Sequence, residues 1–494
     1  MSLEAFLNPE VWILIFVGAA VGYMFGILPG LDGVTGLALF APLGLYLKSE
    51  LTFYFYASML GAVTFAGSVP AILFNIPGEP LAFVTTFDGH PMSRQGRGME
   101  ALAISAVATS LGAFISVAIL IICLPLAQDI VMLFGPAEKF WLVLWAFIAI
   151  PFLSGKDWLK GLVSVTLGLG LSFVGRSVVT GEFRYTFGTH YLGSGVGIIP
   201  FLAIGVFAVR VILGLLSTPH QPISVSSVKV DMRQIWKGAF FVLKRPLSVL
   251  RAALIGTVIG VIPGIGPVTA TFFAYIAARS CSKNPERFGK GEPEGVIAPE
   301  AANNAEQGGA AITTLLLGIP GNLDWAILLG IMIMYGITPG PDLIKEHPNV
   351  VLGVIVGTVA GNAIGSTIGL FAGTQLARLT GMKPLYIIPF VFVSCMVGAY
   401  MIHNVIWDCA IAIVGGLCGY FIEKLDYELL PFTLGFVMGP PIEINFYQTL
   451  QIGLGDYGIF FDSAVSFVLI FLCIVSVVLG PRLRVRIHRD EVTS

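Results

Sequence analysis

The chain has 494 residues, of which 56% are hydrophobic and only 11% are charged, and its formal net charge is -2. An ordinary soluble protein is about 25% charged, so this chain lacks the charge needed to coat soluble domains of its length. The composition argues against a soluble enzyme and a disordered protein, and the near-neutral charge argues against a nucleic-acid partner. Long continuous apolar runs predict an all-α polytopic membrane protein rather than a membrane β-barrel.

The predicted membrane segments form two groups. In chain order, apolar runs begin near residues 11, 51, 102, 140, 159 and 198, and again near residues 250, 310, 350, 385, 405 and 465. A spanning helix needs about 20 apolar residues, so about 10 to 13 transmembrane segments fit in the chain. Pro and Gly interrupt several of these runs, which predicts that some helices are broken or re-entrant.

A polar connector separates the two groups. Residues 218–227 are rich in Pro and Ser, and residues 231–245 read DMRQIWKGAFFVLKR. With Asp231 as its N-cap, the second stretch predicts an amphipathic helix that lies on the cytoplasmic membrane surface. An ordinary solvated connector is the alternative interpretation.

Basic residues predict the orientation in the membrane. They gather at Arg94 and Arg97, at residues 233–251 and 279–290, and in the tail at residues 482–489. Cytoplasmic loops carry an excess of Lys and Arg, so we expect all four regions on the cytoplasmic side.

The sequence contains an internal repeat. Residues 22–30 read GYMFGILPG and residues 256–264 read GTVIGVIPG, and each copy is followed by an Ile-Pro-Gly, at residues 76–78 and 319–321. The basic loop follows Ile-Pro-Gly in the first half and precedes it in the second, as inverted repeats require. The predicted division is a first membrane repeat at 1–217, a cytoplasmic linker with the amphipathic interfacial helix at 218–246, and a second membrane repeat plus an extra C-terminal helix at 247–494.

Four Pro-Gly pairs within apolar runs predict the binding site. Non-helical backbone at membrane depth is tolerated only where protein buries it or where it lines a cavity, and matched broken helices are typical of transporter binding sites. Free N–H groups at the half-helix ends, together with Asn amides, suit a carboxylate. The candidate substrate-binding residues are Gly30, Thr35, Ser68, Asn75, Pro77, Gly78, Gly264, Asn303, Asn304, Thr313, Pro320 and Gly321. The alternative is that the breaks are kinks that serve packing alone.

Asp32 follows the first Pro-Gly pair directly. An ionisable group within a membrane segment is costly, so it indicates a function such as binding sodium or carrying a proton. The alternative is that Asp32 caps a helix at a wet end and has no ligand.

Several chemistries have no motif in the sequence. There is no GxxxxGK[ST] for ATP and no HExxH, and the six histidines are scattered. We therefore expect no enzymatic activity and no cofactor, with sodium or a proton as the coupling ion.

Three stretches carry a resemblance to a known family. They read GSVPAILFNIPGEP at residues 67–80, DGHPMSRQGRG at residues 88–98, and PEGVIAPEAANNAEQGGAAITTLLLGIPGN at residues 293–322. Over nearly its whole length the chain resembles the large membrane (permease) subunit of the tripartite tricarboxylate transporters, although that family usually has glycine at the position of Asp32.

The resemblance implies a multi-pass protein of the bacterial inner membrane. It implies uptake of citrate-like di- or tricarboxylates by a secondary transporter that uses an ion gradient. It also implies two partners, which are a small membrane subunit and a periplasmic solute-binding protein. A gated anion channel is the alternative, because a channel would share the broken helices but would not concentrate its substrate.

Overall fold

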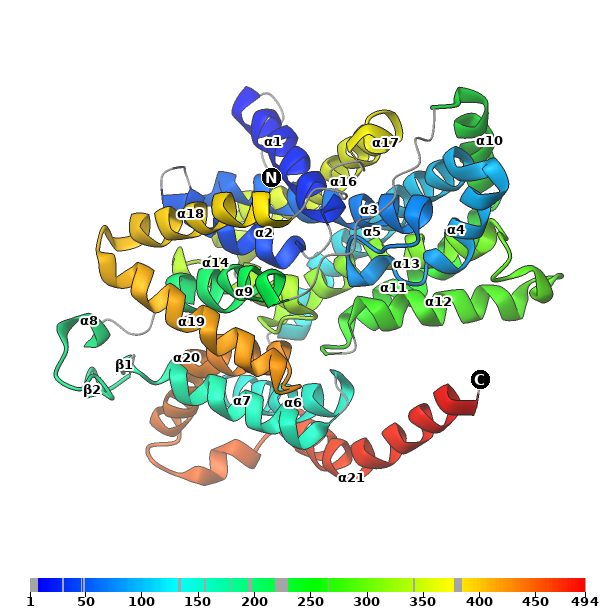
Figure 1. Cartoon of the computed structure of the whole chain (residues 1–494). Helices are drawn as coiled ribbons and strands as arrows, with labels where there is room; N and C mark the ends of the chain where they lie inside the picture. The colour runs from blue at the N-terminus through cyan, green and yellow to red at the C-terminus, as the bar shows by residue number, and fades with distance from the viewer. Residues whose placement is uncertain are drawn as a thin grey trace.

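The computed structural model describes residues 8–28, 31–45, 47, 49–131, 135–154, 157–177, 179–193, 198–217, 230–264, 266–340, 343–376 and 384–493. Within these residues the chain is almost entirely helical (Figure 1). Among the residues that the structure describes, six helices are long and apolar enough to cross a membrane, and seven shorter apolar helices accompany them. The all-α polytopic membrane class is therefore confirmed, whereas the number of crossings stays a prediction.

The helices and strands described for the first half of the chain lie before residue 218. Its α-helices are α1 (Pro9–Ile27), α2 (Gly33–Phe40), α3 (Ser49–Phe74), α4 (Thr86–Met92), α5 (Gly98–Val131), α6 (Pro136–Ser154), α7 (Trp158–Ser172), α8 (His190–Gly193) and α9 (Arg210–Ser217). Short helical turns η2 (Ala41–Leu45), η3 (Pro80–Ala82) and η4 (Ser93–Arg97), the π-helix η5 (Ile198–Val209) and the strands β1 (Gly175–Arg176) and β2 (Phe183–Arg184) complete it.

The second half begins after the connector. Its α-helices are α10 (Met232–Leu243), α11 (Pro246–Val261), α12 (Pro267–Cys281), α13 (Glu294–Leu317), α14 (Leu323–Met334), α15 (Leu343–Glu346), α16 (Pro348–Phe371), α17 (Gly373–Leu376), α18 (Pro384–His403), α19 (Ile406–Lys424), α20 (Leu429–Ile452) and α21 (Ala464–Thr493). The short turns η6 (Pro285–Arg287) and η8 (Tyr457–Phe461) lie between them.

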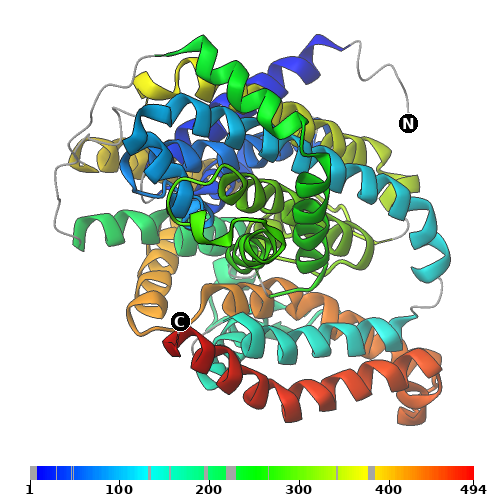
Figure 2. The ribbon, with the colours of Figure 1, turned by 90° about the vertical axis from the view of Figure 1, so that its right-hand side faces the viewer.

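Helices from the two halves pack against each other. Helix α3 packs on α16, and α5 packs on α13. Helices α6, α7, α20 and α21 lie together at the bottom of both views (Figures 1 and 2). The short helices α2 and α14 lie against each other and against η5, within the largest buried apolar cluster, which includes Leu37, Phe55, Phe207 and Leu328.

Glycine allows the helices of each half to approach closely. A Cβ atom added to Gly22 of α1 would lie 2.2 Å from the Met59 carbonyl oxygen of α3, and one added to Gly256 of α11 would lie 2.3 Å from the Ala302 carbonyl oxygen of α13. The number of residues from Met59 to the first Ile-Pro-Gly equals the number from Ala302 to the second. One helix pair of each predicted repeat therefore packs in the same register, while the relation between the whole halves stays a prediction.

Two of the predicted cytoplasmic loops lie together. Asp88 is fully buried, and its Oδ1 accepts hydrogen bonds of 2.8 Å from the backbone N–H groups of Gly291 and Glu292. Its Oδ2 accepts a bond of 2.8 Å from the Tyr275 hydroxyl, and Gln95 Nε2 donates to the Lys290 carbonyl oxygen at 2.8 Å. The loop between α12 and α13 is therefore anchored on the first half of the chain.

Helix α10 joins the same surface. Its N-cap is Asp231, as expected, whereas residues 218–229 of the connector lie outside the described residues. Lys237 Nζ lies 2.9 Å from Glu100 Oε2, and a Cβ added to Gly238 would lie 2.5 Å from the Glu100 carbonyl oxygen. Trp236 and Phe240 stack on the opposite face, with 58% and 54% of their surface exposed. The helix is thus amphipathic, and its place on a cytoplasmic membrane surface stays a prediction.

A small hairpin projects from the other edge of the molecule. Strands β1 and β2 pair antiparallel, with Gly175 opposite Arg184. They lie with α8 at the left of Figure 1, whereas α10, α12 and the C-terminus lie at the right. Arg184 forms an ion pair of 2.9 Å with Glu443 of α20, which fixes the hairpin to the helices.

Candidate functional site

The helices break where the sequence predicts. Helix α1 ends at Ile27 and α2 begins at Gly33, although Pro29 and the candidate Gly30 lie outside the described residues. Helix α3 ends at Phe74, and α13 ends at Leu317. Asn75 and Gly318 follow these two helices, and both adopt left-handed backbone, with φ of 60° and 69°. Asn75 is exposed, and its observed position is that of a residue that ends a helix.

The glycines of the breaks are closely packed. Gly78 N–H donates to the Gly67 carbonyl oxygen at 3.0 Å, and Gly264 N–H donates to the Gly321 carbonyl oxygen at 3.2 Å. A Cβ added to Gly78 would lie 2.2 Å from the Gly26 carbonyl oxygen, and one added to Gly321 would lie 2.7 Å from that of Gly260. These contacts hold Pro77 and Pro320 beside the neighbouring helices, and they occupy two of the backbone donors that the sequence assigns to substrate.

Asp32 has the geometry of a helix cap. Its Oδ1 accepts a hydrogen bond of 2.8 Å from Thr35 N–H and one of 2.6 Å from the Thr35 hydroxyl. Both bonds satisfy donors at the first turn of α2. The capping interpretation of Asp32 therefore matches the structure, and the binding of an ion there stays a prediction.

A group of carboxyls surrounds the start of α2. Gly33 N–H donates to Glu79 Oε1 at 2.9 Å, and the position of a Gly33 Cβ lies 3.2 Å from Asp324 Oδ1. Glu79 belongs to the first half and Asp324 to the second, so the two predicted repeats meet at this point. Glu79 is 3% exposed, and its Oε2 is buried and has no hydrogen-bond partner among the described residues.

Amide side chains connect these carboxyls to Glu306. Asn322 Nδ2 donates to both Glu306 oxygens, at 3.2 and 3.0 Å, and Gln307 Nε2 donates to Asp324 Oδ2 at 3.0 Å. Trp325 Nε1 donates to Gln307 Oε1 at 3.0 Å, while Asn322 Oδ1 caps α14 by accepting from Trp325 N–H. We call this group the break-site cluster; it consists of Asp32, Glu79, Glu306, Gln307, Asn322 and Asp324.

Further polar side chains of α13 extend toward the loop that Asp88 anchors. Ser68 and Thr85 each donate to Glu300 Oε1 at 2.6 Å. Asn304 Nδ2 donates to the hydroxyls of Thr64 and Thr109, at 2.8 and 2.7 Å.

Two side-chain carbonyl groups of α13 are buried without a hydrogen-bond donor among the described residues. Asn303 and Asn304 are buried, and the side-chain carbonyl oxygen of each has no hydrogen-bond partner within the described part of the chain. The Thr313 hydroxyl instead bonds to the Ala310 carbonyl oxygen of its own helix at 3.1 Å. The geometry of Thr313 thus has the pattern of an ordinary helix hydroxyl.

The structure adds residues that the sequence analysis missed. Glu79, Glu306 and Asp324 lie in or beside membrane helices, and Gln307 and Asn322 bridge them. The rule that an ionisable group in a membrane segment indicates a function points to these three acids as well as to Asp32. Within the described residues, no three His, Cys, Asp or Glu side chains lie close enough together to hold a metal ion.

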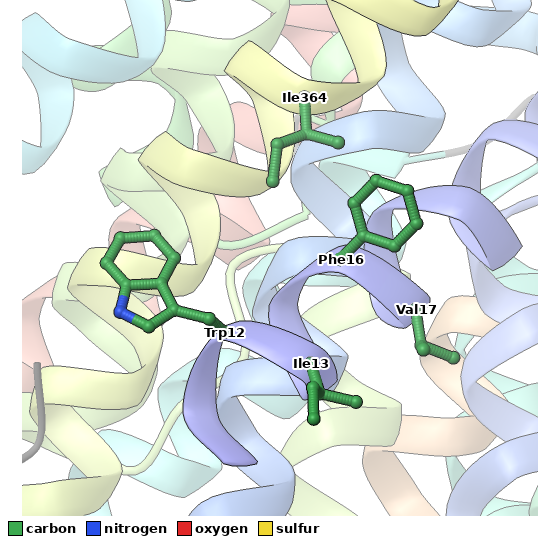
Figure 3. A pocket seen from close by; sticks show the side chains of 5 residues that line it. All are labelled: Trp12, Ile13, Phe16, Val17 and Ile364. Atoms are coloured by element: carbon green, nitrogen blue, oxygen red, sulfur yellow. The ribbon is translucent and has the colours of Figure 1, made fainter. Parts of the chain in front are cut away.

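An apolar groove elsewhere has a different character. It lies between the N-terminal half of α1 and the C-terminal half of α16, has a volume of about 400 Å³, and is lined by Trp12, Ile13, Phe16, Val17 and Ile364 (Figure 3). Four of these side chains lie on α1, well before its break after Ile27. None of these five side chains is charged, so the groove offers no cation to a carboxylate.

Comparison with known proteins gives one family. A sequence model described as the tripartite tricarboxylate transporter TctA family matches residues 12–434. A 52.8 kDa protein from the TAR-I ttuC' 3' region of Agrobacterium vitis, described as uncharacterized, is 32% identical over 500 residues, covering 100% of this chain and 97% of that protein. A second protein, from the TAR-II ttuC' 3' region of the same organism, is 36% identical over 238 residues, which are 48% of this chain and 98% of that protein. No solved structure matches the chain.

Proposed function

This chain belongs to the tripartite tricarboxylate transporter TctA family, the large subunit of such transporters, and we propose that it moves carboxylate anions across the bacterial inner membrane by using an ion gradient. In this proposal the chain is the permease. It takes up di- or tricarboxylates of the citrate type, and sodium or a proton moves with them.

One observation carries the proposal. The helix breaks of both halves meet at a polar cluster buried between α2 and α14, where Gly33 joins Glu79 of the first half to Asp324 of the second. Polar groups are buried at membrane depth only at a cost, and such groups mark substrate or ion pathways. Matched broken helices at the contact of two repeats are the arrangement expected of a secondary transporter.

The charge of the site supports coupling to an ion gradient. No ion pair among the described residues joins a Lys, Arg or His to the break-site cluster. An anion near four carboxyls is repelled unless cations or protons neutralise them. The side-chain carbonyl oxygens of Asn303 and Asn304, which have no partner among the described residues, can accept hydrogen bonds from substrate hydroxyl groups.

Two partners follow from the tripartite organisation of the family. We propose that a small membrane subunit stabilises the permease and that a periplasmic solute-binding protein delivers the substrate. Weak binding within the permease suits a carrier that has to release its cargo, with tight capture left to the soluble protein.

The experiment is uptake by proteoliposomes that contain the chain, the small subunit and a solute-binding protein. Labelled citrate and a panel of di- and tricarboxylates are offered with an imposed sodium or proton gradient, with and without ATP. Accumulation above the outside concentration that ionophores abolish supports the proposal. Equilibration without accumulation supports the gated anion channel instead, and accumulation that requires ATP and survives ionophores contradicts both.

A further inference from the structure

The break-site cluster contains more acid than the surrounding residues can neutralise. Glu79 and Glu306 are 3% and 0% exposed, and Asp32 and Asp324 are partly buried. The carboxyls of Asp324 and Asp32 repel negative charge on Glu79, and the carboxyl of Asp324 also repels negative charge on Glu306. The other described members facing them, Gln307 and Asn322, are neutral. Negative charge at Glu79, Glu306 and Asp324 would therefore be opposed both by burial and by repulsion from neighbouring carboxyls.

A second observation points to the ligand that relieves this charge. Glu79 Oε1 accepts from Gly33 N–H, while Oε2 is shielded from solvent and has no partner among the described residues. A buried carboxylate oxygen without a donor is costly, whereas a carboxylic acid has its own O–H to donate. The carboxyls of Asp324 and Asp32 are the charged neighbours toward which such a donor would be attracted.

The spacing of the acids favours a proton over a metal ion. Glu306 connects to Asp324 only through the amides of Asn322 and Gln307, and no three acids among the described residues converge on one point. A metal cation needs several oxygens around a single position, whereas a proton needs one oxygen and one acceptor. Chains of acids and amides inside a membrane protein are typical of proton relays.

We propose that the break-site cluster holds the coupling proton, which binds to the carboxyls of Glu79, Glu306 and Asp324 and crosses the membrane with the substrate. This inference rests on the proposed function and specifies its ion. The proton enters from the side of higher proton concentration, neutralises a carboxylate, and is released on the other side as the carboxylate forms again. Only O–H bonds form and break, so no other reactant is needed.

The test uses Glu306→Gln and Asp324→Asn in the reconstituted complex, with Glu79→Gln as a third variant in case one of the others fails to assemble. Glu100→Gln is the matched control, because Glu100 is equally buried, at 1% exposed, but has Arg97 and Lys237 as cationic partners. Two readouts are taken: the infrared carbonyl band of protonated carboxyls at neutral pH, and citrate uptake driven by a proton gradient compared with citrate exchange at equal concentrations.

We expect the infrared band to weaken in Glu306→Gln and Asp324→Asn but not in Glu100→Gln. The first two variants should lose accumulation of citrate and retain exchange, because exchange moves no net proton. An infrared band unchanged in all three cluster variants overturns the inference, whatever the result of the citrate uptake and exchange assays. Uptake that only a sodium gradient drives also overturns it while leaving the proposed function intact, whereas failure of every gradient to drive any carboxylate is a failure of the proposed function.

Discussion

The close contact of α1 with α3 gives a prediction with a defined magnitude. In Gly22→Ala the new Cβ would lie 2.2 Å from the Met59 carbonyl oxygen and 2.9 Å from the Met59 carbonyl carbon and Cα. These are backbone atoms, so they cannot rotate away, and α1 has to move outward by about 1 Å to restore an ordinary contact. Overpacking of this kind costs about 1 to 3 kcal/mol. Replacing a helical glycine by alanine also gains about 0.5 to 1 kcal/mol of helix stability.

Gly170→Ala separates the two effects. Gly170 lies in helix α7 and has no atom within 4 Å of its Cβ position. This variant should therefore gain the helix stability that alanine adds, without the cost of overpacking. Unfolding free energies measured by steric trapping in bicelles should therefore place Gly22→Ala about 1 to 3 kcal/mol below Gly170→Ala.

Gly256→Ala tests whether the second half has the same packing. Its Cβ would lie 2.3 Å from the Ala302 carbonyl oxygen, so it should lose nearly as much stability as Gly22→Ala. Equal stabilities for Gly22→Ala and Gly170→Ala would show that α1 and α3 do not meet at this register.

Three further predictions concern orientation and transport. Arg94→Cys should react with a membrane-impermeant thiol reagent only after the cells are opened, because its loop is expected in the cytoplasm; labelling in intact cells contradicts the orientation. Asp32→Asn should fold normally, since Asn caps helices as well as Asp does, and should weaken apparent affinity for the coupling ion more than affinity for substrate. If its ion dependence is unchanged, Asp32 is a cap alone. Asn303→Ala and Asn304→Ala should each raise the half-saturation constant of uptake by the factor that corresponds to a loss of about 1 to 3 kcal/mol of binding free energy, the cost of removing a desolvated amide; full uptake by both places the substrate elsewhere.

The membrane class and the helix breaks could be predicted because they depend on local sequence. Apolar runs identify membrane helices, and Pro-Gly pairs end them at the positions where α1, α3, α11 and α13 stop. The sequence predicts only a range of crossings, because the breaks divide the apolar runs into pieces such as α2 and α14, which are too short to span alone.

The members of the site were harder to predict because their role depends on contacts between distant residues. Asn75 and Gly78 stood out in the sequence, yet the first ends a helix and the second lets backbone atoms approach closely. Glu79 comes directly after Gly78 in the sequence, but only the fold brings it to Gly33 and Asp324. A sequence reveals that an acid lies near a membrane helix, but not which partners it lacks.

The anchoring of the loop at Asp88 has a consequence for the synthesis of the protein. The two backbone groups that donate to Asp88 lie 203 and 204 residues further along the chain. At about 5 to 20 residues per second, a ribosome needs roughly 10 to 40 s to reach them after it has made Asp88. A buried carboxylate without donors is costly, so the nascent chain keeps Asp88 hydrated during that interval. The N-terminal half therefore stays open at this end until α13 emerges, and its closure is one of the late steps of assembly.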